Sequence, residues 1–239
     1  KGDTGLIKQQ EFYDKYVRRA KERVVVIISD AFRFEVGQTL LKRLMEDEKC
    51  TASMDAMQSV LPSYTRFGMS ALLPHRKLSM SNDYNVLVDG KVCDNLNSRE
   101  QVLQSFVPNS RTVQFDDIKT MKIAELKEIF SGQEVVYVYH NQIDARGDKL
   151  NTENEVFTAC EEAVEEIHTM IKRLTSANNI RFIITADHGF IYKRDKLVES
   201  DKISSFEREN AFVGRRYVIA PEGIHAEGVG TLRLGDILG

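Results

Sequence analysis

Long apolar runs and cysteine pairs are both missing from this chain of 239 residues. Its longest apolar stretches, Val24–Ile28 and Val135–Tyr139, are far shorter than the ~20 residues that a membrane-spanning helix needs, so we expect no membrane segment. The three cysteines, Cys50, Cys93 and Cys160, are widely spaced and form no CxxC pair. Neither a disulfide framework nor a zinc knuckle is predicted, and a reducing compartment, the cytoplasm, is the expected location.

An excess of basic residues and the common nucleotide-binding motifs are also absent. Lys and Arg total 33 against 36 for Asp and Glu, which gives a formal net charge of −3. A broadly basic surface for nucleic acid is therefore not predicted, although a local patch would suffice to bind it. There is no P-loop motif and no GxSxG elbow, and Gly228 and Gly230 form a Gly-x-Gly outside any βαβ context. Nucleotide-binding folds are therefore disfavoured.

The two ends of the chain carry no start or stop signal. It begins at Lys1 without an initiator methionine and stops at Gly239 with no obvious terminus. Its length suits one large α/β domain. We therefore expect a single domain over residues 1–239 that is a fragment of a longer protein.

What the sequence does have is an alternation of apolar strands and amphipathic helices. Buried strands are predicted at Val24–Ser29, Val113–Phe115, Val135–Tyr139 and Ile180–Thr185. Helices are predicted at Phe34–Met45, at Asp116–Ser131, which Gly132 would close, and from a Thr152–Glu155 capping box to Leu174. This order predicts an α/β fold whose mostly parallel central sheet is covered by helices on both faces.

Two segments depart from this alternation. Within residues 76–111, the apolar runs Tyr84–Val88 and Lys91–Cys93 flank Asp89-Gly90, which is a hairpin signal. A hairpin that interrupts a strand–helix series predicts a small inserted cap over the sheet. Later in the chain, Phe212–Ala220 predicts an additional strand at the sheet edge.

Carboxylates and histidines gather where three predicted strands end. They are Asp30 after the first strand, His140, Asp144 and Asp148 after the third, and Asp187 and His188 after the last. Since parallel strands present their carboxyl ends at one edge, these acids would repel each other unless a cation joined them. Mixed Asp and His donors suit zinc or manganese better than calcium. Asp30 alone reads as a helix cap and Asp187-His188 alone as a turn, so the conjunction is what favours a metal site.

The segment Pro62-Ser63-Tyr64-Thr65-Arg66 offers a nucleophile. Pro62 stiffens the turn, and Thr65 begins an apolar helical stretch whose free backbone N–H groups suit a phosphate. A threonine hydroxyl bound to a dication can lose its proton near neutral pH and attack phosphorus. The plainer reading is that Ser63 or Thr65 only caps the helix, and the metal candidates favour the nucleophile.

Four motifs follow one another along the chain: Ile28–Glu35, Pro62–Met69 with Leu72–Pro74, Tyr139–Asp144, and Thr185–Phe190. In their order and spacing they resemble the PglZ family of BREX phage-defence systems, within the alkaline phosphatase superfamily. The resemblance spans roughly residues 24–220. It implies an alkaline-phosphatase-like fold, a two-metal phosphohydrolase that usually holds zinc, with manganese as the alternative, and other BREX proteins as partners.

The resemblance also implies roles for individual residues. The first metal's ligands would be Asp30, Thr65, Asp187 and His188, with Thr65 as the nucleophile. Asp144 would match a second-metal ligand, the first residue of an Asp-x-x-Gly-His element in which Asp148 stands here in place of the usual histidine. Asp148 is therefore a further candidate ligand. The family's later histidine is expected beyond Gly239, with His225 as a surface-loop residue.

Four more side chains adjoin the proposed ligands and are candidate phosphate-binding groups: Arg33, Arg66, Arg146 and His140. The arginines could hold phosphate oxygens, but pairing with neighbouring carboxylates is an equal alternative. For His140 a structural hydrogen bond is as good a reading as a role in the site.

The leading hypothesis is a metal-dependent phosphoester hydrolase in phage defence, acting as a phosphatase or as a phosphodiesterase on nucleic acid. The rival is a degenerate phosphatase fold that serves as a protein-interaction module. Asp148 in place of histidine and the missing downstream histidine support that rival. A phosphomutase of the same superfamily is a third reading.

Overall fold

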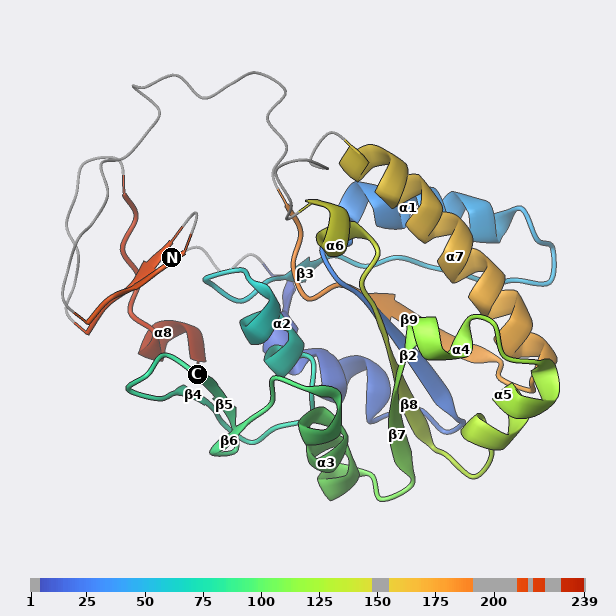
Figure 1. Cartoon of the computed structure of the whole chain (residues 1–239), viewed down its shortest axis with the longest axis horizontal. Coiled ribbons are helices and arrows are strands. Elements are labelled where there is room, and N and C mark those ends of the chain that lie inside the picture. Colours follow the sequence, from blue (N-terminus) through green and yellow to red (C-terminus); the bar gives the residue numbers. More distant parts are fainter. Residues whose placement is uncertain (1–4, 148–154, 191–209, 215–216, 222–228, 239) are drawn as a thin grey trace.

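A four-stranded sheet forms the centre of the computed structural model, which describes residues 5–147, 155–190, 210–214, 217–221 and 229–238 (Figure 1). In spatial order the strands are β7 (Ser110–Gln114), β8 (Val135–His140), β2 (Val24–Ser29) and β9 (Arg181–Thr185). All the pairings between them are parallel, so the predicted parallel sheet is confirmed. The register pairs Ile28 with Thr185 and Ser29 with His140, which brings three strand ends to one edge.

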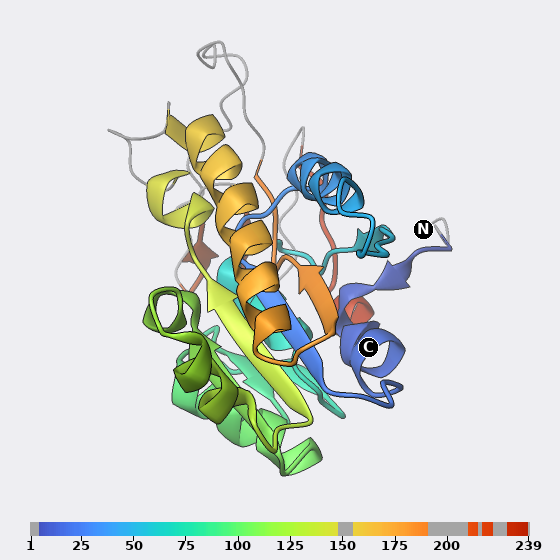
Figure 2. The same ribbon diagram turned by 90° about the vertical axis from the view of Figure 1, so that its right-hand side faces the viewer.

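Helices cover both faces of this sheet, as predicted. The residues of β2 are all buried and alternate between the faces, because each face packs on its own helices. One face packs on α1 (Phe34–Met45), α5 (Ile123–Phe130) and α7 (Val156–Ser176). The other face packs on α2 (Thr65–Ala71), α3 (Leu96–Phe106) and the π-helix η2 (Tyr13–Val17). Figure 2 shows α7 running along its face of the sheet.

The helix predicted at Asp116–Ser131 is wrong in one respect, because the structure divides it. A short helix, α4 (Phe115–Ile118), ends before α5 begins at Ile123. Between them the guanidinium of Arg173, from α7, donates to the backbone carbonyls of Ile118, Lys119 and Met121. These carbonyls are satisfied without a continuous helix, so a distant side chain stabilises the break. Gly132 ends the second helix with φ of 72°, as predicted.

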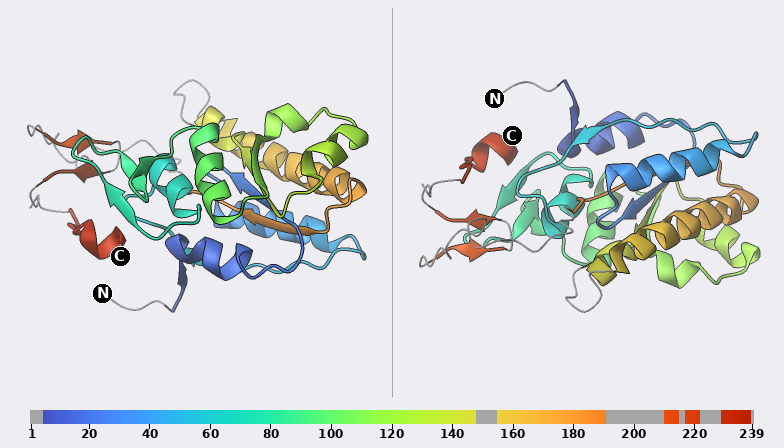
Figure 3. Two further views of the ribbon diagram at one scale, coloured as in Figure 1. Left: turned by 90° about the horizontal axis from the view of Figure 1, so that it is seen from below. Right: turned by 90° about the horizontal axis from the view of Figure 1, so that it is seen from above.

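The predicted hairpin is confirmed and gains a third strand. Strands β4 (Leu78–Met80), β5 (Val86–Val88) and β6 (Lys91–Val92) form an antiparallel sheet, and α3 follows and packs against β7. The late edge strand is wrong, since β10 (Phe212–Val213) pairs with β11 (Val218–Ile219) in a separate two-stranded sheet. Figure 3 shows this pair at the same end of the molecule as β4–β6. Phe212 and Tyr84 there have ring centroids 6.2 Å apart.

The remaining elements are short. They are β1 (Ile7–Lys8), the 3-10 helix η1 (Gln9–Glu11), β3 (Met57–Gln58), α6 (Ile143–Gly147) and α8 (Gly235–Leu238). Thr152, of the predicted capping box, lies outside the described residues. Among the helices that are described, none combines the length and the apolar character needed to cross a membrane.

Candidate metal centre

Three of the four predicted first-metal ligands meet at the carboxyl ends of β2 and β9. Asp30 follows the last residue of β2, and Asp187 and His188 lie just beyond the end of β9. Each offers a ligand atom, and these atoms all lie within 4.8 Å of one another. The parallel register of β2 and β9 is therefore what assembles the cluster.

The fourth predicted ligand, Thr65, reaches the same point from a helix. It is the first residue of α2, after Tyr64 in extended conformation. Its Oγ1 lies 3.0 Å from Nε2 of His188. The neighbouring strand and helix thus bring the predicted nucleophile into contact with the acid–histidine cluster.

Backbone contacts fix the orientation of the ligand side chains. Nδ1 of His188 donates to the carbonyl of Gly189 at 2.9 Å, which leaves Nε2 directed at the cluster. Nε2 lies 3.2 Å from Oδ1 of Asp30 and 3.6 Å from Oδ2 of Asp187. The other oxygen of Asp187, Oδ1, accepts from the backbone N–H groups of His188 and Ala31 at 2.8 and 3.2 Å. One oxygen of Asp187 is therefore anchored while the other faces inward.

The inward oxygens face Nε2 of His188 as ion-pair neighbours but accept no hydrogen bond from the residues that the structure describes. Among the described residues, Oδ1 of Asp30 and Oδ2 of Asp187 are buried and accept no hydrogen bond. Asp30 is 4% exposed and Asp187 is fully buried. Buried carboxylate oxygens are costly to leave unpaired, and a divalent cation would satisfy both at once. Two carboxylates, an imidazole nitrogen and a hydroxyl are a donor set that fits zinc or manganese.

The pKa values of the cluster point the same way. Burial, and then the charge of Asp30, raise the pKa of Asp187 well above its ordinary range. Burial alone would lower the pKa of His188, but the carboxylates of Asp30 and Asp187 outweigh it and raise this pKa to about 9. Without a metal, a proton on His188 supplies the positive charge that these carboxylates require.

The predicted second-metal ligands are not part of this described cluster. Asp144 is partly buried in α6, and the three residues within ligand distance of one another are Asp30, Asp187 and His188. Asp148 and His225 lie outside the described residues. The second site is therefore a prediction from the sequence.

The arginines named as phosphate-binding candidates occupy different surroundings. Arg33 pairs with Glu35 at 2.9 Å, and its guanidinium lies over the ring of Phe190, 4.9 Å from the centroid. Arg66 is exposed on α2, next to Thr65 in sequence. Arg146 pairs with Glu162 of α7 at 2.6 Å. Arg33 lies beside Gly189, which follows His188, and Arg66 follows Thr65 in sequence, while Arg146 is bound to a carboxylate of α7.

His140 has its ring engaged elsewhere. Nδ1 lies 2.9 Å from Oγ of Ser29, and Nε2 lies 3.0 Å from Oε2 of Glu166. The ring also meets Phe115 edge to face, with centroids 4.5 Å apart. Only its backbone serves the cluster directly, because its carbonyl accepts from the N–H of Asp30 at 2.8 Å. These contacts favour the structural reading of His140.

Two residues that support the cluster were not among the predicted site residues. Gln9 is buried and its side chain contacts the backbone of Asp187, while the backbone of Asp187 also packs on Gly68 of α2. A glycine within an apolar helical stretch can have a packing reason, and the position of Gly68 in such a stretch could have indicated one. Nothing marks Gln9, since its contacts span more than 170 residues of sequence.

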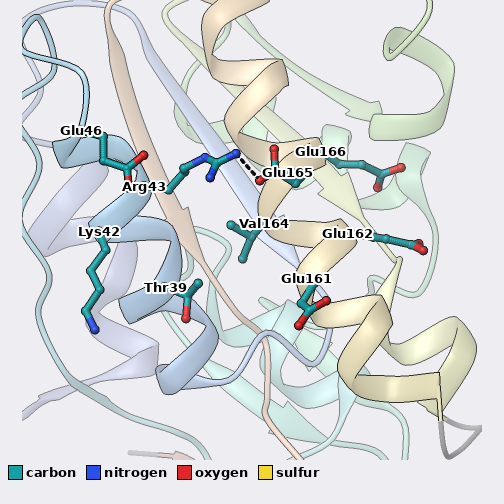
Figure 4. A pocket seen from close by; sticks show the side chains of 9 residues that line it. All are labelled: Thr39, Lys42, Arg43, Glu46, Glu161, Glu162, Val164, Glu165 and Glu166. Atoms are coloured by element: carbon teal, nitrogen blue, oxygen red, sulfur yellow. Dashed lines mark ion pairs between the residues drawn. The ribbon is translucent and has the colours of Figure 1, made fainter.

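A separate cavity of about 680 Å³ lies between α1 and α7 (Figure 4). Its walls carry mainly charged side chains, among them Arg43 of α1 and Glu165 of α7, which form an ion pair of 2.6 Å across it. No residue of the metal cluster lines this cavity. This cavity is therefore separate from the candidate metal centre.

Known proteins resemble this chain over most of its length. The BREX system PglZ alkaline phosphatase-like domain matches residues 10–233. The chain is 39% identical over 242 residues to the alkaline phosphatase-like protein PglZ of Bacillus cereus (strain H3081.97), covering 99% of this chain and 28% of that protein. It is 34% identical over 225 residues to the alkaline phosphatase-like protein BrxZ of Escherichia coli O9:H4 (strain HS), covering 90% of this chain and 26% of that protein.

The chain thus spans about a quarter of the length of these curated relatives. The family match extends over the whole central sheet and over every residue of the described cluster. With its parallel sheet between two layers of helices, the chain belongs to the PglZ family of BREX alkaline phosphatase-like domains.

Proposed function

We propose that this domain hydrolyses phosphoesters, with Thr65 as the nucleophile beside a divalent cation held by Asp30, Asp187 and His188. One observation carries the proposal. Two buried carboxylate oxygens without hydrogen bonds lie beside His188, which is itself 3.0 Å from the hydroxyl of Thr65. Zinc is the proposed metal and manganese the alternative, because the donor set mixes carboxylates with imidazole.

Thr65 would perform the covalent step. When bound, the cation supplies positive charge that favours the alkoxide of Thr65 and offsets the charge on the phosphoryl group. The oxygen of Thr65 forms a bond to phosphorus while the bond from phosphorus to the leaving alcohol breaks. Water then hydrolyses the ester of Thr65, which restores the hydroxyl and releases phosphate from a monoester substrate or a phosphomonoester from a diester.

The rest of the chain would orient the substrate and complete the site. Arg33, which lies beside Gly189, and Arg66, which follows Thr65, are the proposed partners of the phosphate oxygens, with Arg146 and His140 as weaker candidates. Asp144 and Asp148 are proposed to hold a second metal. The β4–β5–β6 sheet is proposed as a cap that helps choose the substrate.

The relatives suggest the biological setting. Both carry names of alkaline phosphatase-like proteins, and the matching domain is that of BREX systems. We propose that the chain acts in phage defence with other BREX proteins, in the cytoplasm. A phosphodiester of nucleic acid is a proposed substrate alongside small phosphoesters.

The test measures zinc content and hydrolysis of an aryl phosphate monoester and an aryl phosphate diester by the zinc-loaded chain. Thr65→Ala is expected to lower the hydrolysis rate by more than about 1000-fold, because the nucleophile is lost. The matched control is Ser63→Ala, which removes an exposed hydroxyl two residues away that contacts Ser59. Its rate should stay near that of the native chain.

Full activity of Thr65→Ala would show that the assigned nucleophile is wrong. A folded chain that binds no metal and hydrolyses neither ester would instead support the protein-interaction role. Asp30→Ala tests whether hydrolysis depends on the bound metal, since it should abolish both metal binding and hydrolysis while the fold persists.

A further inference from the structure

The side chain of Gln9 bridges two segments that are far apart in the sequence. It is 1% exposed. Its Nε2 donates to the carbonyls of Ala186 and Asp187 at 3.1 and 2.7 Å. Its Oε1 accepts from the backbone N–H of Val60 at 3.1 Å and lies 3.4 Å from Oγ of Ser59. Both ends of one buried amide are therefore used.

The two bridged segments lead to different residues of the metal centre. Ala186 and Asp187 carry the chain from β9 into His188. Ser59 and Val60 begin the connection from β3 to Thr65 at the start of α2. The parallel pairing of β1 with β3, which sets Lys8 opposite Gln58, brings Gln9 beside this second segment. Gln9 thus joins the segment that carries the ligands Asp187 and His188 to the segment that leads to Thr65.

The backbone of Asp187 is also confined on its other side. A Cβ added to Gly68 of α2 would lie 2.1 Å from the carbonyl oxygen of Asp187. Such a distance is inside van der Waals contact, so α2 approaches this peptide as closely as a glycine allows. The carbonyl of Asp187 is therefore held between the amide of Gln9 and the backbone of the helix that begins at Thr65.

The chemistry of the bridge requires an amide. The Asp187 side of the bridge consists of two carbonyl oxygens, which need a donor, and the Val60 side presents an N–H, which needs an acceptor. Glutamine offers both from one side chain, whereas glutamate would direct a second oxygen at two carbonyl oxygens. A buried mismatch of that kind is destabilising because the groups cannot turn to water.

We propose that Gln9 is a positioning residue of the metal centre, one that sets the separation between the Asp187–His188 peptide and the segment that carries Thr65. The proposal rests on the metal-dependent function proposed above. Gln9 touches neither a ligand atom nor Oγ1 of Thr65, so it acts through the backbone. A bridge that served stability alone would lower the melting temperature when removed but would leave the affinity for zinc unchanged.

The experiment measures zinc affinity by competition with a chromophoric chelator, on the full chain, alongside circular dichroism and the melting temperature of the metal-free form. Gln9→Glu removes the donor and keeps an acceptor, and Gln9→Met removes both without adding charge. Gln10→Glu places the same charge one residue away on a partly exposed position. Thr112→Val is the stability control, because it removes a buried hydroxyl that donates to the carbonyl of Leu96 at 3.1 Å.

Gln9→Glu and Gln9→Met are expected to fold and to bind zinc about tenfold more weakly or worse, the effect typical of losing an outer partner of a ligand. Gln10→Glu should change neither quantity, and Thr112→Val should lower only the melting temperature. Native zinc affinity in both Gln9 variants, with a lowered melting temperature, would overturn the proposal. Failure of both to fold would also overturn it, since the bridge would then be structural.

The same titration separates this proposal from the function on which it rests. If the native chain binds zinc and Asp30→Ala does not, the metal centre stands and the Gln9 variants decide the positioning role alone. If the native chain itself binds no zinc at this cluster, both proposals fail together.

Discussion

His140 and His188 occupy the same edge of the central sheet, one at the end of β8 and the other just beyond β9. Both are partners of carboxylates, at 3.0 Å from Glu166 and at 3.2 Å from Asp30. Burial lowers the pKa of His140, whereas the carboxylates of Asp30 and Asp187 overcome burial and raise that of His188 to about 9. Two histidines at similar positions thus have pKa values that are shifted in opposite directions.

The difference lies in how many partners the acids have. Glu166 is partly exposed, and the ring of His140 uses both nitrogens in a chain from Ser29 to Glu166. Around His188 two acids are buried, and each keeps an oxygen without a hydrogen bond among the described residues. A histidine at a strand end is therefore a structural group when its neighbours are satisfied. It becomes a candidate ligand when buried carboxylates beside it are not.

The largest expected effect is the difference in zinc affinity between two variants in which each histidine is exchanged for asparagine. His188→Asn should weaken zinc binding by more than about 100-fold, because a ligand itself is lost rather than an outer partner. His140→Asn should leave zinc affinity near the native value and lower the free energy of unfolding by about 2 kcal/mol, since buried polar groups lose their partners. Isothermal titration calorimetry and urea unfolding would measure the two effects. Equal losses of zinc affinity in both variants would contradict the distinction.

Adding one methyl group on the His188 side should have the next largest effect. Gly68→Ala places a Cβ against the backbone of Asp187 and should lower the free energy of unfolding by about 2 kcal/mol, because backbone must move. Zinc affinity should fall as well. The control is Gly37→Ala in α1, where the Cβ would meet the flexible end of Met54 at 3.0 Å. Helix propensity makes that control neutral or stabilising. Denaturant unfolding of both variants would show whether α2 is as tightly packed on Asp187 as the structure indicates.

The pH dependence of stability should have opposite signs for the two histidines. His188 has a folded pKa of about 9 against the ordinary 6.5, so its contribution is complete below pH 6.5 and is lost as the pH rises through 9. The folded pKa of His140 lies below 6.5, so its contribution is present above pH 6.5 and is lost as the pH falls through the folded pKa.

Melting temperatures of the metal-free chain between pH 5 and 10 would check this prediction. A few degrees of destabilisation are expected on the alkaline side, and His188→Asn should remove them. Saturating zinc should remove them too, because the dication replaces the proton on His188. His140→Asn should instead reduce the fall of the melting temperature at acidic pH. If the melting temperature of His188→Asn still falls at alkaline pH, another group must titrate there.

The smallest effect is expected from the outer end of the His140 chain. Glu166→Gln keeps the shape of the side chain and removes its charge at a partly exposed position. The free energy of unfolding should fall by less than about 1 kcal/mol, and zinc affinity should not change. Urea unfolding combined with zinc titration would measure both. A marked loss of zinc affinity would show that the two histidines are coupled through Ser29 and Asp30.

Much of the site could be predicted because it depends on short-range patterns. Buried parallel strands place their last residues at one edge, so Asp30, Asp187 and His188 followed from where two apolar runs stop. Thr65 followed from the start of an apolar helix. The family resemblance then supplied the roles, which the sequence pattern alone would have left open.

The rest depends on contacts between residues that are distant in sequence. The break between α4 and α5 is stabilised by Arg173, more than 50 residues away. The role proposed for Gln9 depends on its contact with the backbone of Asp187, and no periodicity in the sequence around either residue indicates that contact. Likewise, the position of His140 at a strand end did not reveal that its ring would meet Glu166 of α7 rather than the cluster.

The proposed function requires the cluster of Asp30, Asp187 and His188 to hold a divalent cation beside Thr65. Anomalous diffraction at the zinc absorption edge, on crystals of the zinc-loaded chain, tests it most directly. We expect a peak at about 2.0–2.2 Å from Nε2 of His188 and from carboxylate oxygens of Asp30 and Asp187. That peak should be lost in crystals of Asp30→Ala. Zinc-loaded crystals with no peak at this position, or with an unchanged peak in Asp30→Ala, would contradict the proposed function.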